Sequence, residues 1–181
     1  MFVFACAGCG AALTIPLAQV ALPHAHQTFG NGVRLPVLMD PGTFAVEPEP
    51  WGPPWRRWEE VDPDEAAARG IHAPLPALSD GAPGAVAIAP GDARDTVLIP
   101  EKGGGCYCGL GWGDGPNMAC EACGLPVGSR IDDCSVWQVV WFAPCTAGPS
   151  TTPAPGCPPG RNCSRRGRAH LPSSRSPDGA R

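Results

Sequence analysis

Charged residues are missing from the first 33 positions of this 181-residue chain, which contain no Lys, Arg, Asp or Glu. A secretory signal needs a positively charged region before its apolar run, so we expect no such signal here. Pro16, Gln19 and Pro23 also interrupt the apolar stretch well short of the ~20 residues that a membrane span requires. We therefore expect a cytoplasmic protein with no membrane segment.

Common enzyme signatures are missing as well. The chain has no G-x-S-x-G, no H-E-x-x-H, and no Gly-Lys-Ser/Thr after its glycine run at 103–105, which argues against a nucleophile elbow, a zinc protease and a phosphate loop. Asp132 and Asp133 are adjacent, and adjacent residues of a strand point to opposite faces. We interpret them as loop or strand-end acids and assign no catalytic residue.

Glycine and proline are abundant, with 24 of each among the 181 residues. This composition favours long loops, yet aliphatic and aromatic residues recur as far as Phe142. We predict a mainly β, α+β domain over residues 1–145, with one short helix and long loops. Residues 146–181 contain no aromatic residue and are rich in Pro and Arg, which predicts a disordered tail.

Charge divides the chain at the same place. Residues 1–145 hold 7 Lys/Arg and 16 Asp/Glu, a net of −9, whereas residues 146–181 hold 6 Arg and only Asp178, a net of +5. An acidic body repels a phosphate backbone, so we expect it not to bind nucleic acid. The Arg165, Arg166 and Arg168 cluster leaves a weak nucleic-acid association through the tail as an alternative.

Two matching cysteine motifs carry the main chemical signal. Cys6-Ala-Gly-Cys9-Gly10 and Cys120-Glu-Ala-Cys123-Gly124 share the form C-x2-C-G. Two cysteines at this spacing can place both thiolates on one metal ion, and the glycine tolerates a positive φ that turns backbone N–H groups towards the sulfurs. The two motifs, called here the first knuckle (6–10) and the second knuckle (120–124), predict a structural zinc site with four cysteine ligands.

Other ligand sets remain open. Eight of the ten cysteines lie within residues 1–145, which allows a second site. A local set of Cys108, Cys120, Cys123 and Cys134 would close shorter loops at a lower entropic cost. Cys6 and Cys9 would then need other partners. The alternative ligands are Cys106, Cys108, Cys134, His24 and His26, and a disulfide framework is the rival to zinc in an oxidising compartment.

The segment 48–60 places three tryptophans among four prolines. We interpret it as an irregular segment whose indoles anchor it on the core, or as an aromatic surface for a partner. The residues of that surface would be Trp51, Trp55 and Trp58.

Local signals predict several further elements. Asp62 as N-cap and Pro63 at the first helical position predict a short helix ending near Gly70. Residues 2–4 and 13–15 are expected to form hairpin arms around the first knuckle. Hairpins are predicted for 33–39 with 43–46 and for 85–89 with 96–99, around turns at 40–42 and 90–92. Residues 130–142 are expected to form a last, central strand.

The two knuckles resemble those of the zinc-ribbon superfamily over the knuckles and their hairpin arms alone. The resemblance implies structural zinc, with the residues between the knuckles as an insertion. More loosely, the runs 51–58 and 130–134 are similar to an uncharacterised family of small bacterial proteins for which no activity is known. Neither resemblance implies a function.

Our interpretation is a zinc-stabilised binding or adaptor module whose partner is a protein. The alternative from another class is a small metal-dependent enzyme with a pocket in the 24–100 insertion, where His24 or His26 would act as acid-base or metal-binding residue. An exposed histidine pair beside a deep pocket would favour the enzyme.

Overall fold

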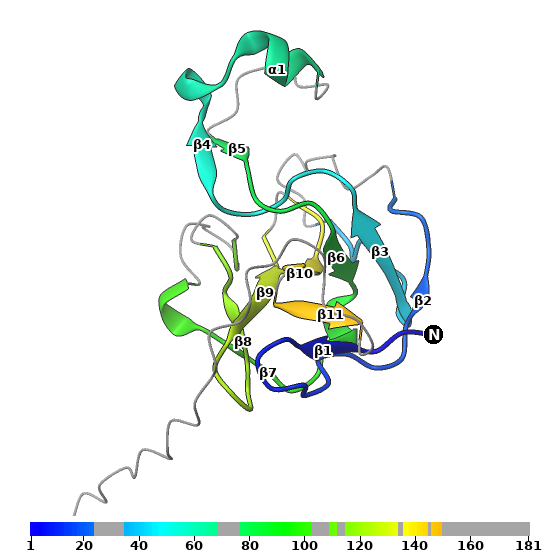
Figure 1. Ribbon diagram of the computed structural model, residues 1–181. Coiled ribbons are helices and arrows are strands. Elements are labelled where there is room, and N and C mark those ends of the chain that lie inside the picture. Colours follow the sequence, from blue (N-terminus) through cyan, green and yellow to red (C-terminus); the bar gives the residue numbers. More distant parts are fainter. Residues whose placement is uncertain are drawn as a thin grey trace, which may run out of the picture.

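The computed structural model describes residues 1–23, 35–68, 77–102, 109–111, 115–133, 136–144 and 146–149 (Figure 1). Eleven strands, one α-helix and three described 3-10 turns make up these residues, which confirms the mainly β prediction. In chain order the elements are β1 Phe4–Cys6, β2 Ala18–Gln19, β3 Thr43–Glu47, β4 Trp55–Arg57, η2 Trp58–Glu60, α1 Pro63–Ala68, β5 Ala77–Ser79, β6 Ala85–Ile88, η3 Pro90–Asp92, β7 Thr96–Leu98, η4 Pro100–Lys102, β8 Met118–Cys120, β9 Pro126–Ile131, β10 Val139–Phe142 and β11 Ala147–Pro149.

A seven-stranded sheet forms the centre, in the order β2-β3-β6-β10-β9-β8-β7. All neighbours are antiparallel except β2 and β3, which are parallel. The sequences of β6 (AVAI) and β10 (VVWF) are apolar at every position, and all eight residues are buried. Strands buried on both faces need such continuous apolar runs, which is why these two strands lie in the middle of the sheet.

Each face of this sheet carries its own hydrophobic cluster. The first cluster joins Val140 and Phe142 of β10 to Phe4, Leu13 and Leu17 of the N-terminal segment. The second cluster joins Val139 and Trp141 to Ile131, Met39 and Leu38. The alternation along β10 follows from the two-residue period of a strand. The first face is therefore the one that the N-terminal hairpin covers.

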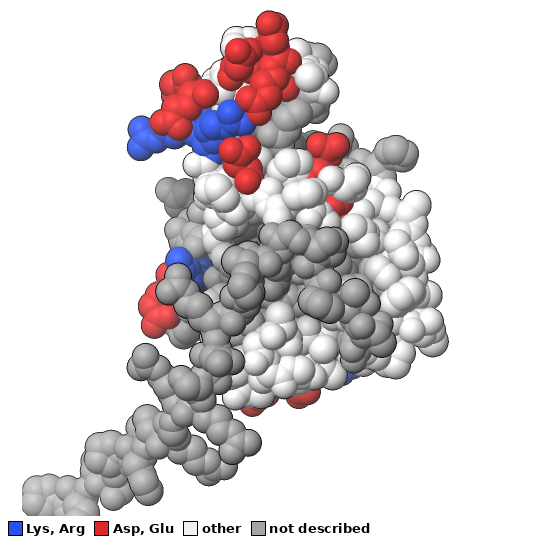
Figure 2. Space-filling view, in the orientation of Figure 1, with Lys and Arg blue, Asp and Glu red and all other residues white. Residues whose placement is uncertain are grey.

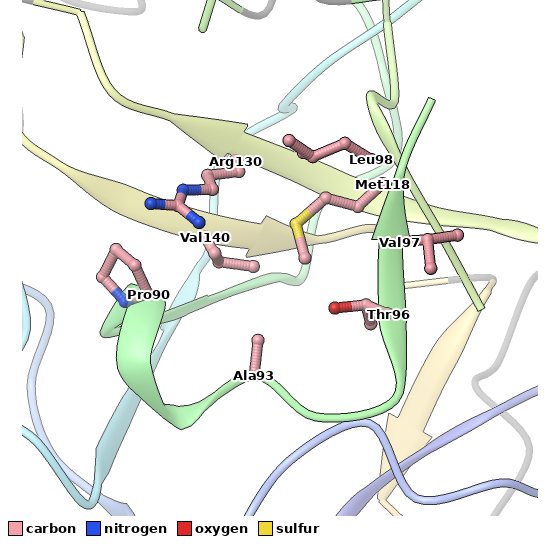
Figure 3. Close-up of a pocket in the computed structure, with 8 residues that line it drawn as sticks. All are labelled: Pro90, Ala93, Thr96, Val97, Leu98, Met118, Arg130 and Val140. Carbon is pink, nitrogen blue, oxygen red and sulfur yellow. The ribbon is translucent and has the colours of Figure 1, made fainter. Parts of the chain in front are cut away.

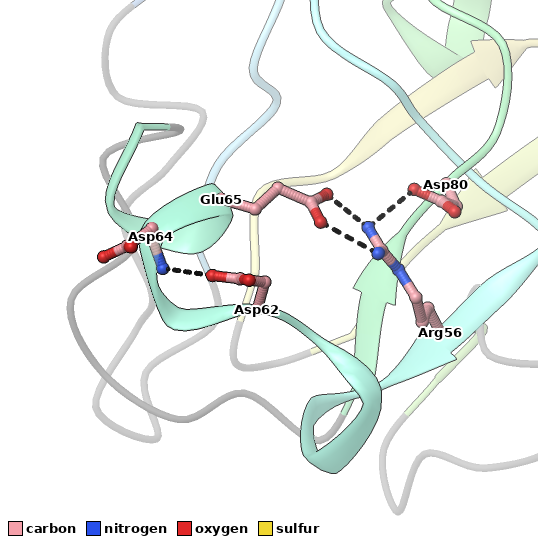
Figure 4. Close-up of polar contacts among 5 residues, drawn as sticks. All are labelled: Arg56, Asp62, Asp64, Glu65 and Asp80. Carbon is pink, nitrogen blue, oxygen red and sulfur yellow. Dashed lines mark hydrogen bonds and ion pairs between the residues drawn. The ribbon is translucent and has the colours of Figure 1, made fainter.

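Two small sheets complete the fold. β1 pairs with β11, and β4 pairs with β5. The β4–β5 pair, η2 and α1 form an arm (described residues 51–68 and 77–80) that projects from the body in Figure 1. The helix prediction is confirmed. Its cap residue is Asp62, whose Oδ1 accepts a hydrogen bond of 2.7 Å from the Asp64 N–H (Figure 4).

Arg56 holds the arm together (Figure 4). Its guanidinium forms a two-point ion pair with Glu65 of α1 and a further contact of 3.2 Å with Asp80 beyond β5. Beside it, Trp58 packs against Val61 and Ala66 in a third small cluster. The arm thus has limited packing of its own, and Trp51 at its base packs against the second cluster of the large sheet.

The two further predicted hairpins are wrong, although most of their strands exist. Residues 43–46 lie in β3, but β3 pairs with β6 and β2, and Val37 forms an isolated parallel pair with Gln138 instead. β6 and β7 also exist, yet they lie at different places in the sheet. The turn between them is η3, whose buried Asp92 accepts a hydrogen bond from the Gly42 N–H rather than closing a hairpin.

The segment 130–142 is predicted as one last strand, but it contains the end of β9 and the whole of β10. These two strands are antiparallel neighbours, and β10 is central as expected.

The body also extends beyond the predicted boundary at residue 145. Ala147 of β11 is buried and pairs with Cys6 of β1. The rest of the predicted tail lies outside the described residues.

Within the part of the chain that the structure describes, no helix combines the length and the apolar character that a membrane crossing needs.

Candidate metal centre

The first knuckle is a tight turn at the end of a short hairpin. The Cys6 N–H donates to the Ala11 carbonyl at 2.8 Å, and the Gly10 N–H donates to the Cys6 carbonyl at 2.8 Å. Gly10 has a φ of 76°, which a glycine adopts without the strain of a side chain. The arms of the hairpin are held by the isolated pairs Ala5 with Ala12 and Phe2 with Leu17, as the sequence predicts.

The second knuckle repeats this geometry between β8 and β9. The Cys120 N–H donates to the Leu125 carbonyl at 2.8 Å, and the Gly124 N–H donates to the Cys120 carbonyl at 2.8 Å. Gly124 has a φ of 75°. The same C-x2-C-G sequence therefore produces the same local backbone twice, because the hydrogen bonds and the positive φ involve only residues of each motif and its hairpin.

The structure brings the four cysteines of the two knuckles together. Their sulfur atoms all lie within 4.8 Å of one another. Cys6 Sγ is 3.6 Å from Cys123 Sγ, and Cys9 Sγ is 3.7 Å from Cys120 Sγ. Each close pair joins the first cysteine of one knuckle to the second cysteine of the other.

These spacings suit a tetrahedral metal ion. Zinc–sulfur bonds of about 2.3 Å at tetrahedral angles place neighbouring sulfurs about 3.8 Å apart. They are too long for disulfides, whose S–S bond is about 2.05 Å, and all four cysteines are free thiols. The cluster has the donor set and the shape of a closed metal site, and four thiolates leave no open coordination position.

The two cysteines of each knuckle differ in their exposure to solvent. Cys6 and Cys120 are buried, Cys123 is half-buried and Cys9 is exposed. Burial raises the pKa of the Cys6 thiol to about 12 and also raises the pKa of Cys120. In contrast, a hydrogen bond from the Ala11 N–H lowers the pKa of Cys9. Without a metal ion, the two buried sulfurs favour the neutral thiol.

Backbone N–H groups support the thiolate form that a metal needs. The Gly8 N–H donates to Cys6 Sγ at 3.4 Å, and the N–H groups of Ala122 and Cys123 face Cys120. These donors compensate part of the negative charge of the sulfurs. Both knuckles supply them, since both turn their backbone around the first cysteine.

Gly8 is a site residue that the sequence analysis did not single out. A Cβ at this position would lie 3.4 Å from Cys123 Sγ and 3.2 Å from Leu125 Cδ2. The only available signal was its small size within the first knuckle. Its proximity to the second knuckle follows from the contact between two distant segments, which no local pattern contains.

The sequence analysis also named five alternative ligands. Cys106, Cys108, Cys134, His24 and His26 all lie outside the described residues. The local set with Cys108 and Cys134 would have to share Cys120 and Cys123, whose sulfurs already face those of the first knuckle.

The three tryptophans of the predicted partner surface have different surroundings, and all are half-buried. Trp51 stacks on Trp141 of β10, with ring centroids 5.1 Å apart. Trp58 packs within the arm. Trp55 lies on β4, and its buried Nε1 has no hydrogen-bond partner among the described residues. Trp51 therefore anchors the base of the arm to the large sheet, whereas Trp55 and Trp58 belong to the arm itself.

Two cavities are lined by described residues. One, of about 210 Å³, lies beside β7 and reaches Met118, Arg130 and Val140. The other, of about 190 Å³, lies beside Trp51 and Pro144. Neither is lined by a His, Cys, Asp or Glu side chain, so neither presents a general acid or base for the enzyme alternative.

Comparison of the chain with family models, curated proteins and solved structures found no match. The zinc-ribbon resemblance thus rests on the geometry of the four cysteines alone.

Proposed function

We propose that this protein is a zinc-stabilised binding module in which one structural zinc ion joins the first knuckle to the second. The observation that carries the proposal is the crossed pairing of sulfurs, Cys6 with Cys123 and Cys9 with Cys120, at 3.6 and 3.7 Å. The paired cysteines are 117 and 111 residues apart in the sequence. A metal at this point closes the fold between segments that share little other pairing.

The donor set favours zinc in a structural role. Soft thiolates in a tetrahedral arrangement select zinc or iron among common metals. A catalytic zinc keeps an open position for water, whereas four cysteine ligands occupy all positions. The proposed ion therefore supplies folding free energy and takes no part in a reaction.

Elemental analysis tests the metal assignment. The full-length protein would be purified without added metal or chelating resin, as wild type and as Cys6→Ser and Cys120→Ser. Cys157→Ser serves as the matched control, because this cysteine lies in the predicted disordered tail, outside both knuckles. We expect one zinc per chain in the wild type and the control, and none in the other two variants.

Two results would contradict this assignment. Zinc retained in Cys6→Ser but lost in Cys120→Ser would select the local set with Cys108 and Cys134. A metal-free wild type with oxidised cysteines would overturn both zinc and the reducing compartment. Iron in place of zinc would keep the four ligands and correct the metal.

The binding part of the proposal concerns the arm. Its described residues carry six acidic side chains against two arginines, and Figure 2 shows the acidic groups gathered at its end. The acidic residues are Glu59, Glu60, Asp62, Asp64, Glu65 and Asp80. A projecting element with little packing of its own and an excess of negative charge suits a protein partner with a basic face.

A charge reversal on the arm tests this surface. Glu60 is exposed on the arm, and Glu101 is exposed on the body, so Glu60→Lys and Glu101→Lys make the same charge change at two places. Crosslinking followed by mass spectrometry would compare the partners of both variants with those of the wild type. We expect a partner that Glu60→Lys loses and Glu101→Lys retains, with equal zinc content in all three proteins. Identical partner sets would contradict the arm as the binding surface.

A further inference from the structure

Arg130 occupies a position of the large sheet where the strand pattern places a core residue. Its partner on β10 is Val140, which is fully buried in the first cluster. Opposite residues of an antiparallel pair point to the same face. Among the described strand residues of this sheet, Arg130 is the one charged side chain on the face that the N-terminal hairpin covers. The Arg130 side chain is only partly covered there, with 42% of its surface exposed.

The guanidinium of Arg130 is incompletely paired within the described residues. Its Nε is buried and has no hydrogen-bond partner. Its Nη2 lies 3.8 Å from Asp132 Oδ2, which is longer than a hydrogen bond. A buried donor without an acceptor costs free energy. Because the side chain as a whole keeps 42% of its surface exposed, a ligand oxygen can reach the guanidinium and accept hydrogen bonds from it.

A cavity of about 210 Å³ opens beside Arg130 (Figure 3). The side chains of Met118 and Val140 form its apolar wall, and Ala93 faces them from the segment after η3. The Thr96 hydroxyl points into the space, and Arg130 lies at one end. The volume equals that of about seven water molecules at ~30 Å³ each, which admits a small organic molecule.

We propose that this cavity binds a small organic monocarboxylate, with its carboxylate on Arg130 and its hydrocarbon part against Met118 and Val140. Guanidinium groups pair with carboxylates through charge-assisted hydrogen bonds, and the Thr96 hydroxyl is a further donor. Met118 and Val140 offer apolar contact to the hydrocarbon part. The carboxylate of Asp132 offsets part of the positive charge, so a monoanion fits better than a dianion such as phosphate.

The cavity stands beside the second knuckle. Thr96 is the partner of Cys120 in the β7–β8 ladder, and the Glu121 N–H donates to the Asp95 carbonyl at 2.9 Å. The knuckle therefore positions one wall of the cavity. The recognition itself comes from Arg130, so this proposal does not depend on which metal the cysteines hold.

Methionine methyl NMR on the full-length protein tests the proposal, because the chain has only three methionines. Met118 lines the cavity, Met39 is buried in the second cluster on the opposite face, and Met1 is exposed. Butyrate and benzoate are the probes, with butyramide and benzamide as neutral controls of the same shape. We expect the carboxylates to shift the Met118 signal saturably and to leave Met39 and Met1 unchanged. A Met118→Leu variant assigns the signal.

Arg130→Gln removes the positive charge and is expected to weaken carboxylate binding about tenfold or more, as for the loss of a charge-assisted hydrogen bond. Arg57→Gln, at an exposed position of β4 in the arm, makes the same change elsewhere and is expected to bind as the wild type does. An unshifted Met118 signal would overturn the proposal. So would equal binding of the amides, equal binding by Arg130→Gln, or displacement of butyrate by an equal concentration of inorganic phosphate.

Discussion

The two knuckles share their internal geometry and differ in what surrounds them. Both have the same hydrogen bonds and a glycine with a φ near 75°. The second knuckle joins β8 and β9, which belong to the seven-stranded sheet. The first knuckle follows β1, whose ladder partner among the described residues is β11, and the other arm of its hairpin is bonded to the segment 92–94 by isolated contacts. A metal shared between them would attach the weakly paired hairpin to the strongly paired one.

Removing the metal ion should have the largest effect, and it should destabilise the hairpin of the first knuckle more than that of the second. Structural zinc sites contribute about 10 kcal/mol of apparent binding free energy. Chelation should therefore expose the backbone amides of residues 2–17 to hydrogen exchange, while β8 and β9 keep their ladder bonds to β10 and β7. Hydrogen exchange with mass spectrometry, with and without chelator, measures this difference. β3 and β6 serve as the internal control, and an equal loss of protection in both hairpins would refute the comparison.

Replacing either knuckle glycine by alanine should have a smaller effect on the free energy of unfolding, and the effect should be the same in both knuckles. A Cβ at Gly10 or Gly124 meets no atom within 4 Å, so only the positive φ opposes it. We expect Gly10→Ala and Gly124→Ala each to lower the free energy of unfolding by about 1–2 kcal/mol. Denaturant unfolding would measure both.

Gly91→Ala is the matched control for these variants. Gly91 also has an empty Cβ position but no positive φ. We expect its unfolding free energy to stay within about 0.5 kcal/mol of the wild type. A cost for Gly91→Ala as large as for the knuckle variants would show that backbone strain is not the cause.

Both knuckles should release protons when zinc binds. This effect involves no large change in stability. Burial raises the pKa of both Cys6 and Cys120, so both are protonated at pH 7 in the metal-free protein. Thiols must lose their protons to bind zinc, and zinc affinity should therefore rise with pH. Calorimetric titration at pH 7 in buffers of different ionisation enthalpy should detect the release of at least two protons per zinc ion. Binding without proton release would contradict the assignment of these two ligands.

Local patterns predicted the parts of the fold whose hydrogen bonds are local. The C-x2-C-G motifs formed two equivalent turns, and Asp62 with Pro63 marked the start of α1. The hairpins predicted around 40–42 and 90–92 failed for the opposite reason. Turn residues show where the chain bends but not which strands then pair, and β6 pairs with β3 and β10 because their apolar faces fit together.

The candidate sites also differ in whether a local sequence pattern could predict them. Two cysteines within one knuckle are positioned by a single turn, so their type and spacing were sufficient to nominate Cys6, Cys9, Cys120 and Cys123. Arg130 gave no comparable signal, since its neighbours in the cavity come from β7, β8 and β10. The amino-acid order alone thus specified the knuckles, the short helix and the β-rich composition. Strand pairing, the meeting of the two knuckles and the cavity at Arg130 depended on contacts between distant segments, whose free energy exists only when the whole sheet has formed.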